Sequence, residues 1–127
     1  MMRDMDLIRT LLESIASDSR LNGNVMLHPD IGDFGISAEN YESVAFHLNL
    51  MLNAQLIEGK DTMQMPMVRS LTWRGYDFLE SVQSPEVWQK TKDAAKKVGG
   101  VGFDILIGIA KAYGKQLVQE KLGIHLD

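Results

Sequence analysis

Histidine and serine are the residue types whose spacing could do chemistry in this chain, and their pattern indicates no catalytic site. His47 is followed by Leu50 and Met51 at the positions where a helix would have to carry a second metal ligand. His28 and His125 have no suitably spaced partner either. No serine lies in a G-x-S-x-G motif, and cysteine is absent, which excludes thiolate sites and disulfides. We therefore expect no enzyme activity, no metal and no cofactor.

The segment Lys-Lys-Val-Gly-Gly-Val-Gly, residues 96–102, could form an anion-binding nest of backbone N–H groups at the start of a helix. It lacks the spacing and the Gly-Lys-Ser/Thr ending of a P-loop, which favours a flexible hinge. The carboxylates are scattered over faces predicted to be solvated. No small-molecule substrate is evident.

Charge and hydropathy describe a folded protein with an acidic first half. The formal net charge is −4, and residues 1–67 contain ten acidic but only four basic residues. Such a surface fits a phosphate backbone poorly. The most apolar stretch, residues 101–110, is half the length of about twenty residues that a membrane crossing needs. Charges interrupt the first twelve residues, so no signal peptide is indicated and we expect a cytoplasmic protein.

Hydrophobic periodicity predicts the elements that would position a site. Helices are expected over residues 4–17, with Asp4 as the N-cap, and over residues 37–53, with Ser37 as the N-cap. Between them, residues 25–27 are long enough for one short strand.

A hairpin is expected next. Residues 58–61 predict a turn, and Met63, Met65 and Met67 alternate with other residues as in an edge strand. Residues 68–72 could form the return strand. A helix then begins at about Thr72.

Two further helices complete the pattern. Ser84 and Pro85 are typical of a helix start, and they precede a helix over residues 86–98. The last helix covers residues 103–122. This order predicts an α+β fold that is mostly α: a winged helix-turn-helix domain over residues 1–83, followed by a helical extension over residues 84–127.

Residues 47–58, His-Leu-Asn-Leu-Met-Leu-Asn-Ala-Gln-Leu-Ile-Glu, resemble the H-L-x-x-L-x-x-A-G-L-I pattern of small winged-helix regulators. Gln55 stands where that pattern has a glycine that helps the helix to end.

The whole chain also resembles an uncharacterised family of short bacterial and prophage proteins, the domain of unknown function numbered twenty-five thirteen. The resemblance implies a winged-helix fold but no established activity. The segments that carry it are residues 3–9, 47–57, 71–79 and 87–92 and the Gly99-Gly100 break.

The helix over residues 37–53 is the one that would enter the DNA major groove of a winged helix. Its outer face has no Lys or Arg, whereas readers of bases and phosphates usually supply several. Phe46 and Leu50 form an apolar pair that fits a protein surface, or the underside of the C-terminal helices. The candidate partner-binding residues are Glu39, Glu42, Ser43, Phe46, His47, Asn49, Leu50 and Asn53.

His47, at the edge of this helix, is better interpreted as a partly buried histidine with local hydrogen bonds. Ser43, Asn49 and Asn53 could donate hydrogen bonds to bases. The residues that would contact phosphates, if the partner is DNA, are Lys60, Arg69 and Arg74.

The last predicted helix is apolar on two sides, of which the body of the domain can cover one. A symmetry mate would most simply cover the other, so we expect a homodimer, with burial inside the chain as the alternative. The expected interface residues are Ile105, Gly108, Ile109 and Ala112.

Two functions fit these observations. The first is a non-catalytic winged-helix module that binds DNA, such as a regulator from a prophage or mobile element. The alternative is a protein-binding adaptor or inhibitor that uses the apolar and acidic face of residues 37–53.

Overall fold

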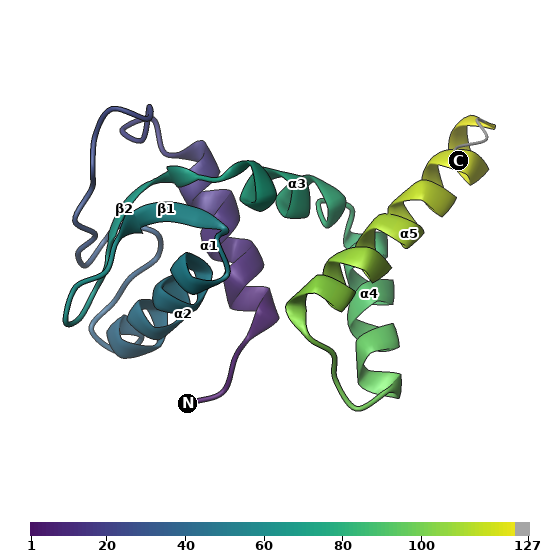
Figure 1. Ribbon diagram of the computed structural model, residues 1–127, viewed down its shortest axis with the longest axis horizontal. Helices are drawn as coiled ribbons and strands as arrows, with labels where there is room; N and C mark the ends of the chain where they lie inside the picture. Colours follow the sequence, from purple (N-terminus) through teal and green to yellow (C-terminus); the bar gives the residue numbers. More distant parts are fainter. Residues whose placement is uncertain (124–127) are drawn as a thin grey trace. The chain divides into compact units, whose positions relative to one another are not determined.

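Five α-helices and a two-stranded antiparallel sheet make up residues 1–123, the part of the chain that the computed structural model describes (Figure 1). The fold class is α+β and mostly α, as the sequence predicts. The chain forms two compact units, Met1–Tyr76 and Asp77–Asp127. This division falls inside the third helix, and the boundary expected after residue 83 stays a prediction.

Helix α1, Met5–Ser17, begins where the sequence predicts because Asp4 caps it. The Asp4 carboxylate accepts hydrogen bonds from the backbone N–H groups of Asp6 (3.0 Å) and Leu7 (3.2 Å). One stripe of the helix is buried in the first unit. The residues of this stripe are Ile8, Leu11, Leu12 and Ile15.

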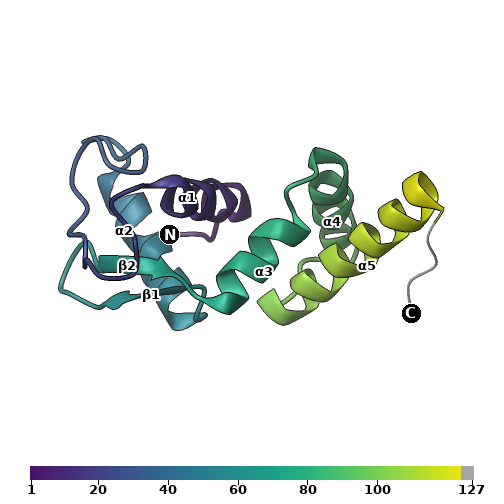
Figure 2. The same cartoon turned by 90° about the horizontal axis from the view of Figure 1, so that it is seen from above.

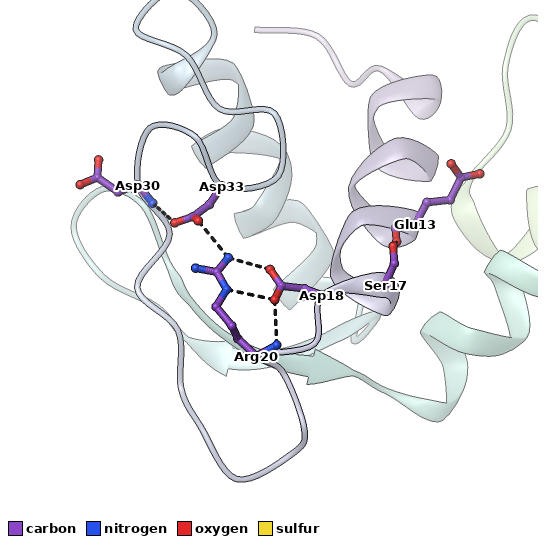
Figure 3. Close-up of polar contacts among 6 residues, drawn as sticks. All are labelled: Glu13, Ser17, Asp18, Arg20, Asp30 and Asp33. Atoms are coloured by element: carbon purple, nitrogen blue, oxygen red, sulfur yellow. Dashed lines mark hydrogen bonds and ion pairs between the residues drawn. The ribbon is translucent and has the colours of Figure 1, made fainter.

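Ion pairs around Arg20 hold the long connection that follows α1 (Figure 3). The Arg20 guanidinium donates to Asp18 Oδ2 at 2.7 Å and to Asp33 Oδ1 at 2.9 Å. The hydrogen bonds from Arg20 lower the pKa of Asp18. The backbone N–H of Asp30 and then Arg20 lower the pKa of Asp33. At the end of α1, the Ser17 hydroxyl donates to the Glu13 carbonyl.

The strand expected at residues 25–27 is reduced to one bridge. Leu27 exchanges two backbone hydrogen bonds with Val68, both 2.8 Å long. Asn22, Gly23 and Asn24 turn the chain just before this point, so too little extended backbone is left for a strand.

Helix α2, Tyr41–Asn53, starts later than the sequence predicts, and Ser37 is not its N-cap. Ser37 N–H donates to Asn40 Oδ1 at 2.6 Å, and Asn40 N–H donates to Ser37 Oγ at 3.3 Å. These side-chain hydrogen bonds hold a turn that competes with the first helical turn. The buried residues of α2 are Val44, Ala45, His47, Leu48 and Met51.

Strands β1, Ile57–Lys60, and β2, Met67–Leu71, pair as an antiparallel hairpin with an irregularity at Glu58/Gly59. Gly59 is required at this point, because a Cβ atom there would lie 2.0 Å from the Met67 carbonyl oxygen. The turn expected at residues 58–61 is therefore wrong, since most of this segment is strand β1.

Residues 61–66 form the tip of the hairpin, and the edge strand expected from the three methionines begins only at Met67. The Thr62 hydroxyl donates to the Met65 carbonyl (2.8 Å) and accepts from Gln64 N–H (3.2 Å). These bonds close a compact turn that buries Met65 and leaves Met63 fully exposed. The alternation of methionines thus reflects a turn and not a strand.

Helix α3, Trp73–Ser81, starts as predicted because the Thr72 hydroxyl accepts a hydrogen bond from Gly75 N–H at 3.0 Å. The same hydroxyl donates to the Gln55 carbonyl at 2.6 Å, which links α3 to the end of α2. A Cβ atom at Gly75 would lie 2.0 Å from the Leu56 carbonyl oxygen. The helix therefore packs directly against the backbone that leads into β1.

Helices α4, Pro85–Lys97, and α5, Phe103–Leu122, lie side by side in the second unit (Figure 2). Phe78 contacts Trp88 and Phe103, with ring centroids 6.3 and 5.0 Å apart, and these rings centre the core of this unit. The expected bounds of both helices agree with the structure to within a residue. Among residues 1–123, no helix has both the length and the apolar character that a membrane crossing requires.

Candidate functional site

The outward side of α2 and of the turn before it is the largest cluster of candidate residues that the structure brings together. Glu39, Glu42 and Asn53 are exposed, and Phe46 and Leu50 are half-buried. We call this the α2 surface; it consists of Glu39, Glu42, Ser43, Phe46, Asn49, Leu50 and Asn53. None of its residues is basic, so its formal charge is −2.

His47 does not belong to the α2 surface. Its side chain is 1% exposed. Its Nδ1 lies 2.7 Å from the Ser43 carbonyl oxygen, and its Nε2 accepts a hydrogen bond from Asp4 N–H at 2.8 Å. The histidine therefore holds α2 to the start of α1 and is not available to a partner. It is fully buried and not partly buried as expected, and only the hydrogen bond with Ser43 is local, since Asp4 is distant in the sequence.

Phe46 and Leu50 lie one helical turn apart on the α2 surface. The Phe46 ring packs edge-to-face on the His47 imidazole, with centroids 5.2 Å apart and planes at 86°. Because the buried histidine holds the inner side of this ring, its outer side can serve as a pre-positioned apolar contact. A rigid aromatic side chain of this kind loses little conformational entropy when a partner binds.

Asn49 serves the fold of the first unit. Its amide nitrogen donates to the Ala45 carbonyl at 3.0 Å and reaches the Gln64 carbonyl at 3.4 Å. The side chain thus links α2 to the tip of the hairpin. Asn53, at the other end of the helix, is the exposed amide of the α2 surface.

The three candidate phosphate contacts lie on different elements. Lys60 and Arg69 are exposed on β1 and β2, and the exposed Glu58 of β1 and Asp61 of the hairpin loop cancel their charge. Arg74 is half-buried in α3. It lines a hollow of about 370 Å³ at the junction of α2, β1 and α3.

Sequence reasoning missed Trp73, which lines the same hollow and is 89% exposed. Gln55 also lines it and has a left-handed backbone, with φ of +61°. The sequence signal for this strain was the glycine that the winged-helix pattern has at this position. An exposed tryptophan is unusual, and no motif or spacing in the sequence singled out Trp73 as a candidate.

A second hollow, of about 350 Å³, lies between the first turns of α2 and the tip of the hairpin. In Figure 1 the loop that joins β1 to β2 reaches the start of α2. Sequence reasoning had placed only one of its residues, Glu42, on a candidate site. The residues that line it are Tyr41, Glu42, Ala45, Met63 and Gln64.

In the second unit, α5 has the two sides that the sequence predicts. Leu106 and Ala110 are buried, whereas Gly108 and Ala112 are exposed and Ile105 is 60% exposed. Ile109 is half-buried between the two sides. Among residues 1–123, a Cβ atom at Gly108 would meet no atom within 4 Å, so nothing in this part of the chain requires a glycine there.

Another hollow of the second unit, about 540 Å³, lies between α3 and α5. Asp77 and Lys111 form an ion pair at its rim, and Val87 and Ala110 lie at its base. Within residues 1–123, no group of three histidine or carboxylate side chains is arranged to hold a metal ion. His125 lies outside the described residues.

The comparisons with known proteins identify the family. The profile of the family described as hypothetical protein (DUF2513) matches residues 2–102. The chain belongs to this family. The match covers the first unit except Met1 and continues through α4, and this confirms the family resemblance that the sequence carries.

A Haemophilus influenzae protein described as an uncharacterized protein is similar over nearly the whole length. It is 28% identical over 126 residues, which cover 96% of this chain and 99% of that protein. No solved structure matches the chain.

Proposed function

We propose that this chain is a non-catalytic regulatory module of the winged-helix type that binds another protein through the α2 surface. The observation that carries the proposal is the composition of that surface: two exposed glutamates, an apolar pair and no basic residue. Phe46 and Leu50 would supply the buried centre of an interface, and Glu39 and Glu42 its charged rim.

The charge of the α2 surface favours a protein over duplex DNA. Proteins bind the phosphate backbone by replacing condensed counterions with Lys and Arg. Glu39 and Glu42 would instead bring two carboxylates towards the phosphates at the point where the helix enters the groove. The hairpin has no net charge to offset this repulsion.

Duplex DNA is the second candidate partner, as for a regulator of a prophage or mobile element. The order helix, bridge, helix, hairpin and helix favours it, because that is the plan of a winged helix. Lys60 and Arg69, both exposed on the hairpin, would then contact phosphates, with Arg74 as a further contact.

We further propose that the protein is a cytoplasmic homodimer joined through α5. The exposed side of α5, with Ile105, Gly108 and Ala112, supports this proposal. An antiparallel pair of helices centred on Gly108 would place Asp104 of each copy near Lys111 of the other, because these residues lie four and three positions from the centre. In a parallel pair, Asp104 of one copy would instead lie beside Asp104 of the other, and Lys111 beside Lys111, so that like charges would repel.

Fluorescence anisotropy with a labelled mixed-sequence duplex tests the choice of partner. We expect no measurable binding at low salt. Binding that falls steeply as salt is added would contradict the protein-partner proposal and establish the DNA-binding alternative.

Affinity capture with the wild type and with Phe46→Ser/Leu50→Ser tests the surface itself. A partner captured by the wild type and lost with this variant is expected. The matched control is Val98→Ser, which changes an exposed apolar residue outside the α2 surface. Equal capture by all three proteins would remove the α2 surface as the binding site.

A further inference from the structure

We propose that the hollow between α2 and the tip of the hairpin binds an arginine side chain of the partner protein. This inference rests on the proposed function and names the chemistry of the contact. The hollow has a volume of about 350 Å³ and belongs wholly to the first unit. It combines one carboxylate, one aromatic ring and one fully exposed methionine.

The carboxylate of Glu42 has no cation within the described chain. Two other glutamates of the helices pair with a base one turn away, Glu13 with Arg9 and Glu86 with Lys90. Among residues 1–123, the exposed Glu80 of α3 resembles Glu42 in having no such pair. The residues one turn from Glu42 are Ala38 and Phe46, so its own helix offers no base. Within residues 1–123, no ion pair or side-chain hydrogen bond engages Glu42. A cation supplied by a partner molecule would form an ion pair with the Glu42 carboxylate.

The other lining residues fit the stem and the plane of an arginine. Tyr41, half-buried at the start of α2, offers an aromatic ring on which a guanidinium can stack. Met63 is flexible and fully exposed, and its thioether can follow the aliphatic part of the side chain. Ala45 keeps the base of the hollow open because its side chain is small.

The walls of the hollow are held in place by hydrogen bonds. The Thr62 hydroxyl closes the turn at the hairpin tip through its bonds with Met65 and Gln64. Asn49 reaches from α2 to the Gln64 carbonyl. A site held in this way loses less entropy on binding than a loop that must first be ordered.

The dipole of α2 explains an acidic residue in its first turn, since a carboxylate is favourable there. It does not explain why a tyrosine and a fully exposed methionine surround the same carboxylate. An experiment can decide whether Glu42 only stabilises the helix or also binds a ligand, because only binding depends on the charge of an added ligand.

Titration of the full-length protein with N-acetyl-arginine amide, followed by NMR, tests the proposal. We expect saturable shifts at the backbone amides of Glu42, Ala45 and Gln64. N-acetyl-citrulline amide, which has nearly the same shape without the charge, should give none. Glu42→Gln should weaken arginine binding about two- to fivefold, as expected for loss of an ion pair at an exposed carboxylate.

Glu80→Gln is the matched control, since it removes the same charge from an exposed position of α3 that lies outside the hollow and outside the α2 surface. It should leave arginine binding nearly unchanged. Equal weakening by both variants would show general attraction to an acidic surface, and equal shifts with citrulline would show that charge is irrelevant; either result overturns the proposal.

Failure of this inference is distinguishable from failure of the proposed function. Absence of arginine binding, together with capture of a protein that Phe46→Ser/Leu50→Ser loses, would overturn the arginine site alone. Salt-sensitive DNA binding would overturn the protein-partner proposal and, with it, the partner's arginine.

Discussion

His47 Nε2 accepts a hydrogen bond from the backbone N–H of Asp4 at 2.8 Å, so a side chain in the middle of α2 is joined to the N-cap of α1. Since Nε2 is the acceptor, the ring proton lies on Nδ1, which donates to the Ser43 carbonyl at 2.7 Å. The two helices are thus joined by a buried polar group as well as by apolar packing.

Replacement of this histidine should destabilise the first unit. His47→Leu fills much of the space but leaves the Asp4 N–H without its acceptor, and the expected loss is about 1–3 kcal/mol in the free energy of unfolding. Urea unfolding followed by circular dichroism measures it. The control is His28→Leu, at an exposed histidine. Similar losses in both variants would show that the hydrogen bond is unimportant.

Gln55→Gly should stabilise the protein. Gln55 has a φ of +61°, a conformation that costs a side-chain-bearing residue about 1–2 kcal/mol and a glycine almost nothing. Part of this gain is lost because glycine is more flexible in the unfolded chain, so we expect a net increase of about 0.5–1 kcal/mol. Gln55→Ala keeps the strain and should show no such gain in the same thermal unfolding experiment.

Alanine should have opposite effects at two helical glycines. At Gly75 a Cβ atom would lie 2.0 Å from the Leu56 carbonyl oxygen, so the backbone must move, at a cost of about 1–3 kcal/mol. At Gly108 the added methyl group meets nothing, and the better helix propensity of alanine should raise stability by about 1 kcal/mol. Calorimetry at low protein concentration compares them. A loss at Gly108 would contradict the open space found there.

Ile105→Asn should dissociate the proposed dimer without unfolding the second unit. Ile105 is 60% exposed, so its loss removes little internal packing, whereas a polar residue would weaken an apolar interface. Analytical ultracentrifugation measures the oligomeric state, and Val98→Asn, at an exposed position before α5, is the control. A wild type that stays monomeric at high concentration would contradict the dimer.

Acid should reduce the stabilisation that the carboxylates of Asp18 and Asp33 give to the folded connection after α1. Both carboxyl groups have a pKa below the ordinary value of 3.8 in the folded protein. The unfolded chain therefore binds protons first as the pH falls, so the stabilisation is complete above about pH 5 and is lost progressively below it. Arg20→Met should lower the melting temperature at neutral pH and flatten its decline in acid. An unchanged acid profile would show that Arg20 does not set these pKa values.

Local rules predicted most of the elements correctly. Asp4, Thr72 and Ser84 each start a helix through a side-chain hydrogen bond to a nearby backbone N–H, which depends on a few adjacent residues. The helix bounds around these caps follow from the apolar stripes. The same rule failed at Ser37, because its side chain bonds to Asn40 in a turn and delays α2.

The hairpin shows where periodicity is insufficient. The alternating methionines fit a strand, but the Thr62 hydroxyl closes a turn through its bonds with Met65 and Gln64, so that β2 begins only at Met67. Whether a period of two belongs to a strand or to a turn depends on pairing with a distant partner.

By itself, the sequence determined the mostly α class, the starts of all the described helices except α2, the missing basic residues of the α2 surface and the two apolar sides of α5. Only the tertiary structure decided that His47 is buried, that Met63 is exposed beside Tyr41 and Glu42, and that Trp73 is 89% exposed. The reason is physical: charge and capping are properties of a residue and its neighbours in the chain. Burial depends on which distant segment packs against that residue. In this protein the segments that pack against α2 are the tip of the hairpin and the start of α1.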